Sequence, residues 1–187
     1  MSSQSFTLFD TALGPCGIAW GANGLVGVQL PERDRSAMRG RLTRRFPEAE
    51  EVTPSPGVQR AIDSIVSLLA GEASDLSAIR LDMERVPPFH RRVYEVARGI
   101  PPGATLGYGE IAQRLGEPGA AREVGQAMGR NPFPIVVPCH RVLAAGGKIG
   151  GFSANGGIET KRKMLAIESV HARGEPTEPT LFDRADP

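Results

Sequence analysis

A pair of adjacent prolines near the middle of the chain constrains the fold more than any other feature. They close the segment Glu84-Arg85-Val86-Pro87-Pro88, and two consecutive prolines block regular structure and stiffen the backbone. Strand-like runs followed by helical runs precede this segment, whereas the pattern after it is helical. The sequence therefore predicts an α+β protein with an N-terminal domain over residues 1–84, a C-terminal domain over residues 85–170 and a disordered tail over residues 171–187.

The predicted N-terminal domain combines short strands with helices. Glycines divide residues 6–30 into strand-like runs and tight turns. Residues 57–71 carry apolar side chains at helical spacing, and residues 76–83 alternate loosely, as a closing strand would. Cys16 lies in the first region without a neighbouring histidine, which favours a structural role. Because this half carries no motif for chemistry, we assign it a supporting role.

The arginine-rich stretch over residues 31–51 has two interpretations. One is a basic nucleic-acid patch, and the other is a solvated amphipathic helix with Met38, Leu42 and Phe46 on its inner face. We favour the helix. The formal net charge of the whole chain is only +1, so any nucleic-acid contact has to come from a local basic face.

Three helices are predicted after the two prolines, over residues 89–100, 108–115 and 120–129. The last two are short and are joined by the turn Gly116-Glu117-Pro118-Gly119, an arrangement typical of a helix-turn-helix. By spacing alone, a plain helical packing unit is the simpler interpretation.

The hexapeptide Val137-Pro138-Cys139-His140-Arg141-Val142 carries the residues best suited to catalysis. The cysteine is a soft nucleophile, the histidine is a candidate base, and the flanking proline presents the thiol from a stiff turn. A Cys-His pair alone is weak evidence, because a free cysteine is usually a small buried hydrophobe. The chain has two cysteines, which provide neither a disulfide framework nor the paired spacing of metal ligands, so we expect no metal site.

The chain also lacks the signals of export and membrane insertion. Its first residues have no basic and apolar regions of a signal peptide, and no apolar run approaches the ~20 residues that span a bilayer. A lone reactive thiol is best preserved in a reducing cytosol. We therefore expect a cytoplasmic protein without membrane contact.

The stretch around the hexapeptide resembles the O6-alkylguanine-DNA alkyltransferases. The resemblance rests on Ala120-Ala121-Arg122-Glu123-Val124-Gly125, on Asn131-Pro132 and the hexapeptide, on Gly150-Gly151-Phe152-Ser153 and on Thr160-Lys161-Arg162. It is close over residues 89–168 and loose before them. It implies a ribonuclease H-like N-terminal domain, a winged helix-turn-helix-like unit in the C-terminal domain, and a monomer without cofactor. It also implies that the protein acts on double-stranded DNA containing alkylated bases. By this resemblance, the alkyl group of O6-alkylguanine is transferred irreversibly to Cys139, and O4-alkylthymine is a second candidate substrate.

The resemblance also assigns catalytic roles. His140 acts on the Cys139 thiol through a bridging water and lowers its pKa, and Glu168 orients the imidazole, in the logic of a Ser-His-Asp triad. Tyr108 donates a proton or hydrogen bond to the guanine ring, and Asn131 ties the second helix of the helix-turn-helix to the cysteine loop. From the residues alone, Glu168 would be a solvated carboxylate at a helix end and Tyr108 a half-buried core residue.

The remaining roles concern DNA and the base pocket. By resemblance, Arg122 fills the gap left by a flipped base, and the small Ala121 and Gly125 let the second helix approach the floor of the minor groove. Side chains of Val142, Phe152 and Ser153 line the alkyl pocket. The sequence departs from the family at two places, the acidic Glu123, which weakens attraction to phosphates, and the inserted Ala154-Asn155, which lengthens the pocket loop.

Three functions of other classes are alternatives to this one. A non-catalytic lesion binder similar to the alkyltransferase-like proteins would carry another residue in place of Cys139. A Cys-His hydrolase normally needs separated catalytic residues and an oxyanion hole, neither of which is visible. A regulator of the adaptive-response type would need an additional cysteine-rich metal domain. The alkyltransferase is the function we predict.

Overall fold

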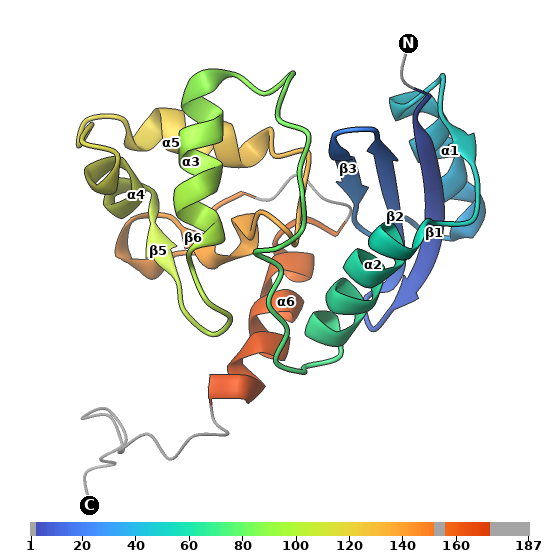
Figure 1. Ribbon diagram of the computed structural model, residues 1–187. Coiled ribbons are helices and arrows are strands. Elements are labelled where there is room, and N and C mark those ends of the chain that lie inside the picture. Colours follow the sequence, from blue (N-terminus) through green and yellow to red (C-terminus); the bar gives the residue numbers. More distant parts are fainter. Residues whose placement is uncertain (1–2, 152–155, 173–187) are drawn as a thin grey trace, which may run out of the picture.

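The protein is a mixed α+β structure, known here from a computed structural model that describes residues 3–151 and 156–172. Figure 1 shows a sheet flanked by helices beside a second, mainly helical group. The first group contains β1 (Ser5–Thr11), β2 (Gly14–Gly21), β3 (Gly24–Gln29), α1 (Arg35–Arg45), β4 (Glu50–Glu51) and α2 (Pro56–Leu69). The second contains α3 (Pro88–Arg98), β5 (Leu106–Gly107), α4 (Tyr108–Arg114), α5 (Ala121–Gly129), the 3-10 turns η1 (Cys139–Arg141) and η2 (Ala145–Gly147), β6 (Val142–Leu143) and α6 (Gly157–Ala172).

The four-stranded sheet has the order β3-β2-β1-β4, in which β1 to β3 form an antiparallel meander and β4 pairs parallel with β1. The turns entering β2 and β3 place Gly14 and Gly24 at positive φ, where glycine has no steric penalty. Helices α1 and α2 cover opposite faces of this sheet (Figure 1), because each face carries its own apolar cluster. Met38 and Leu42 are buried on the inner face of α1, which confirms the amphipathic helix expected there.

The strand predicted over residues 76–83 is wrong. This segment meets the sheet in an isolated bridge between Leu25 and Leu81, with the Leu25 amide donating to Arg80 over 2.9 Å. The physical reason is that a side-chain donor binds the backbone carbonyls of this segment in place of a neighbouring strand. The guanidinium of Arg98 donates to the carbonyls of Leu76, Ser77 and Ile79, which a strand would have offered to a neighbouring strand.

The two prolines at the predicted boundary follow a segment without helix or named strand, and the next helix begins at the second of them. Pro87 is the N-cap of α3 and Pro88 is its first residue, a position where the amide is not needed for the helix ladder. The helices predicted over residues 108–115 and 120–129 are present as α4 and α5, which pack against each other and against α3. The buried Tyr94 of α3 fastens this group by donating its hydroxyl to the Ala127 carbonyl at 2.8 Å.

The last described helix, α6, lies between the two groups in Figure 1 and contacts both α2 and η1. It continues to Ala172, so the tail begins at least two residues later than predicted. The rest of the tail, residues 173–187, lies outside the described residues. None of the helices in the described part of the chain is long and apolar enough to span a membrane.

Candidate active site

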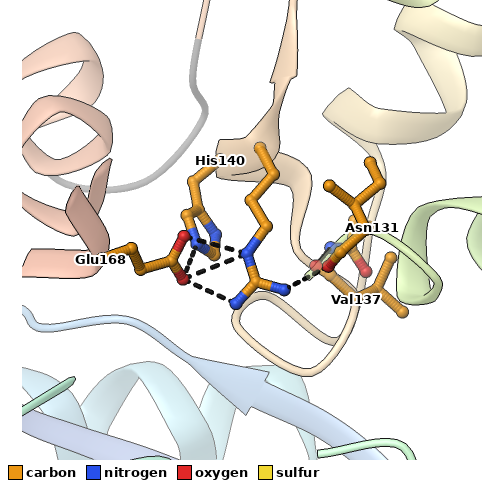
Figure 2. Close-up of polar contacts among 6 residues, drawn as sticks. Asn131, Val137, His140 and Glu168 are labelled. Atoms are coloured by element: carbon orange, nitrogen blue, oxygen red, sulfur yellow. Dashed lines mark hydrogen bonds and ion pairs between the residues drawn. The ribbon is translucent and has the colours of Figure 1, made fainter. Parts of the chain in front are cut away.

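The cysteine loop is held by the side chain of Asn131, which precedes it. Its Nδ2 donates to the Val137 carbonyl at 2.8 Å, as Figure 2 shows, and its Oδ1 accepts from the Phe133 amide at 2.9 Å. Between these points Ile135 adopts a φ of 76°, in a region that a β-branched residue rarely occupies. One side chain thus stabilises a strained turn that leads directly into the nucleophile.

Cys139 begins η1 and is 7% exposed. Burial raises the pKa of its thiol, while a hydrogen bond from the Asn131 side chain and the positive charge of Lys161 oppose the rise. We expected His140 to lower this pKa below its usual value. Instead, the pKa of Cys139 is raised, because the desolvation of the thiolate outweighs the groups that stabilise it. Cys139 is therefore a protonated thiol at neutral pH and needs a base.

The base that the structure offers is His140, which is fully buried beside Glu168 (Figure 2). Its Nε2 lies 2.7 Å from Glu168 Oε1. Burial lowers the pKa of the imidazole, which is therefore neutral at pH 7 despite the opposing hydrogen bond to Glu168. An ionised carboxylate only accepts hydrogen bonds, so Nε2 carries the hydrogen and Nδ1 presents the lone pair. Within the described residues Nδ1 has no hydrogen-bond partner.

Glu168 is ionised because its neighbours outweigh the cost of burying it. Burial alone would raise the pKa of this carboxyl, but hydrogen bonds from His140 and Arg141 lower it to about 2. Arg141 donates from Nε at 2.9 Å and from Nη2 at 2.6 Å, and its Nη1 donates to the Ile100 carbonyl at 2.6 Å. This paired arrangement fixes the carboxylate, and through it the tautomer and the orientation of the imidazole.

A second buried cation, Lys161, acts on the thiol by its charge. Its side chain is 1% exposed and its Nζ donates to the Val142 carbonyl at 2.7 Å. Burial lowers the pKa of Lys161, while the charge of the Cys139 thiolate raises it. The amine therefore stabilises the thiolate by charge and holds the strand that follows η1.

Tyr108 is half-buried at the start of α4 and faces α5. A Cβ added at Gly125 would lie 3.7 Å from its ring, and one at Gly150 would lie 2.9 Å from its hydroxyl. Burial raises the pKa of Tyr108, and the charge of Cys139 in its thiolate form raises it further. The phenol therefore stays protonated at neutral pH and is available as a donor next to the thiol.

The helix α5 presents its charged residues to solvent. Arg122 and Glu123 are exposed in the first turn, and Ala121 is half-buried.

Of the residues predicted to line the alkyl pocket, Val142 is fully buried directly after η1. The other predicted pocket residues, Phe152 and Ser153, lie outside the described residues, as does Ala154-Asn155.

Comparison with known proteins agrees with this arrangement. Residues 88–170 match the family described as "6-O-methylguanine DNA methyltransferase, DNA binding domain". The chain is 37% identical over 179 residues to the methylated-DNA–protein-cysteine methyltransferase of Mycobacterium tuberculosis, a match that covers 95% of this chain and 98% of the relative. The corresponding protein of Methanothermobacter thermautotrophicus is 33% identical over 159 residues, covering 85% of this chain and 82% of that one.

The chain belongs to the methylated-DNA–protein-cysteine methyltransferase family. A crystal structure of the M. tuberculosis OGT in complex with DNA matches with a TM-score of 0.72 and 35% identity, covering 89% of this chain and 93% of the other. Membership in the methyltransferase family favours alkyl transfer over the hydrolase and the regulator, and the thiol at position 139 argues against the non-catalytic lesion binder.

Two residues of this methyltransferase site were not predicted to act there. Arg141 stands next to the histidine in the hexapeptide, but its burial and its bonds to Glu168 follow from the packing. Lys161 lies seven residues before Glu168, so α6 directs both toward the same buried side, with the buried Met164 between them. A lysine and a glutamate on the apolar side of a helix predict buried, paired charges.

Proposed function

We propose that this protein repairs DNA by moving the alkyl group of O6-alkylguanine irreversibly onto Cys139. The observation that carries the proposal is the imidazole of His140, the residue that follows the buried Cys139. Its Nε2 is bound to Glu168 and its Nδ1 has no hydrogen-bond partner among the described residues. A thiol that is protonated at rest becomes nucleophilic only when a base removes its proton.

The reaction balances with the residues at hand. The proton of Cys139 moves through a bridging water to His140 Nδ1, and the ionised Glu168 stabilises the resulting imidazolium. The sulfur attacks the alkyl carbon, so an S–C bond forms as the C–O bond breaks, and the electron pair remains on the guanine. Tyr108 donates a hydrogen bond or proton to the guanine, where negative charge develops. The thioether is a poor leaving group, so each molecule acts once.

Access to the target base requires that the nucleotide leave the stack. We propose that α5 lies in the minor groove, with the small Ala121 and Gly125 allowing close approach and Arg122 filling the vacated space. The exposure of Arg122 supports this role. Asn131 would then couple α5 to the nucleophile, since it follows the helix and holds the cysteine loop. Val142, together with Phe152 and Ser153, is proposed to line the alkyl pocket.

The finer fold assignments are also proposals. A meander joined by a parallel β4 supports a ribonuclease H-like N-terminal domain over residues 1–84. The packed pair α4 and α5, next to the short β5-β6 sheet, supports a winged helix-turn-helix-like unit within residues 85–170. We further propose that the protein acts as a cytoplasmic monomer, because a reducing compartment preserves the thiol on which the reaction depends.

The deciding experiment is the intact mass of the protein after incubation with a duplex containing O6-methylguanine. We expect one added methyl group per molecule, on the peptide that contains Cys139, and none in Cys139→Ser. Cys16 serves as the internal control, because it is fully buried and burial raises its pKa to about 12. A methyl group on Cys16, or more than one methyl removed from DNA per protein molecule, would contradict the proposal.

A further inference from the structure

We propose that the cleft between α1 and the C-terminal end of α5 is a phosphate site, and that it holds a backbone phosphate of the DNA bound by α5. The cleft has a volume of about 220 Å³, and its lining includes Gln29, Arg41, Arg45, Arg130, Pro132 and Cys139. The inference rests on the proposed function, because it extends the DNA contact to the N-terminal half of the chain.

The first observation is a half-buried guanidinium without a carboxylate partner in the described part of the chain. Arg45 donates to the carbonyls of Val28 at 2.8 Å and Pro132 at 2.9 Å, and more weakly to the Gln29 side chain at 3.4 Å. These acceptors are all neutral. Burial, and then the charge of Arg41, lowers the pKa of Arg45. The guanidinium also lies over the Phe46 ring, 4.9 Å from its centroid. Its positive charge therefore lies next to another positive charge with only neutral partners, an arrangement that an anion stabilises.

Two other arginines of the same helix, Arg35 and Arg39, are paired with carboxylates. Arg35 lies 2.7 Å from Asp10, and Arg39 binds Glu51 through two bonds of 2.6 and 3.0 Å. Arg41, by contrast, has its carboxylate neighbour, Glu32, at 3.9 Å. Arg41 and Arg45, which line the cleft, are thus less fully paired with carboxylates than Arg35 and Arg39.

The third cation comes from the helix that we place on DNA. Arg130 is the exposed C-cap of α5, and no salt bridge involving it occurs among the described residues. Because Arg130 lines the cleft together with Arg41 and Arg45, the cleft is formed by both α5 and α1. A duplex that follows α5 beyond its C-terminal end would carry its phosphates toward Arg130 and Arg41, whereas a free anion in the cleft would contact only the C-terminal end of α5. This continuity selects a DNA phosphate as the occupant, and guanidinium groups suit phosphate geometry.

The test measures the salt dependence of binding to an unmodified duplex that extends beyond α5 at both ends. Each neutralised phosphate contributes about 0.9 to the slope of log K against log salt concentration. Arg41→Gln should reduce the slope by about 0.9, and its deficit relative to wild type should shrink about 3.5-fold between roughly 50 and 200 mM salt. Arg39→Gln removes the same charge from the same helix, outside the cleft, and should keep the wild-type slope.

Parallel slopes for wild type, Arg41→Gln and Arg39→Gln would overturn the inference. Thermal unfolding in inorganic phosphate and in chloride at equal ionic strength separates the alternative source. If phosphate stabilises wild type more than Arg41→Gln while the DNA slopes stay equal, the cleft binds free anions only and the DNA assignment is wrong. Methylation of Cys139 in the same wild-type preparation reports separately on the proposed function.

Discussion

The Nε2 atom of His140 lies 2.7 Å from Oε1 of Glu168, and both side chains are buried at the junction of η1 and α6. This contact directs the second imidazole nitrogen away from the carboxylate and leaves it as the basic atom. It depends on residues 28 positions apart in the chain. Under the proposed mechanism, the reactivity of the thiol therefore depends on the packing of α6 as well as on the hexapeptide.

The pH dependence of Cys139 alkylation tests this relationship. Because the pKa of the thiol is raised and that of His140 is lowered, the rate should fall as His140 becomes protonated at acidic pH. His140→Ala and Glu168→Gln should each slow the reaction at neutral pH by about a hundredfold, the range of a lost general base. High pH should partly restore both, since hydroxide then supplies the thiolate.

The control for this pH profile is Glu159→Gln, an exposed carboxylate in the first turn of the same helix. It should retain the wild-type profile, and DNA affinity should be unchanged in all the variants. Superimposable profiles for wild type and the two site variants would remove His140 and Glu168 from the mechanism.

Acid stability follows from the low pKa of Glu168. Burial raises this pKa, but the bonds from His140 and Arg141 lower it to about 2, against about 4.3 in an unfolded chain. A depressed carboxyl pKa stabilises the fold above the unfolded value and loses that contribution as the pH falls toward the folded value. We expect the free energy of unfolding to drop by about 3 kcal/mol between roughly pH 5 and 2. Urea unfolding across this range measures the drop, and Glu168→Gln should flatten it.

Arg122 separates DNA handling from chemistry. If it occupies the space of the flipped base, Arg122→Ala should slow repair of duplex DNA by about tenfold to a thousandfold, because unstacking costs a few kcal/mol. The reaction with free O6-benzylguanine needs no flipping and should be unaffected. Arg60→Ala, an exposed arginine of α2, controls for the lost charge. Equal losses on both substrates would instead place Arg122 in support of the fold.

Lys161 should tune the thiol directly. Its charge lowers the pKa of Cys139, although burial has the larger and opposite effect. Lys161→Met should therefore move the alkaline limb of the alkylation profile to higher pH and slow the reaction at pH 7. Lys163→Met changes an exposed lysine of the same helix and should leave the limb in place. An unmoved limb in Lys161→Met would limit Lys161 to holding the Val142 carbonyl.

Local patterns predicted the helices well, because the spacing of apolar residues such as Met38 and Leu42 survives into the fold. The failures involve groups distant in sequence. The segment 76–83 is not a strand because Arg98, about twenty positions later, occupies its carbonyls. Likewise, the raised pKa of Cys139 follows from burial under other elements, which a hexapeptide does not reveal. The resemblance named Glu168, but the buried Arg141 that fixes it became evident only from the packing.

The contrast between the two cysteines has a practical consequence. Cys16 has no exposed surface and a pKa of about 12, whereas Cys139 retains 7% exposure. A small thiol reagent applied to the folded protein at neutral pH should therefore label one site per unspent molecule. Thiol titration of the native protein would therefore count the molecules that have not yet reacted. Under the proposed mechanism this number, and not a turnover rate, limits how many lesions are removed.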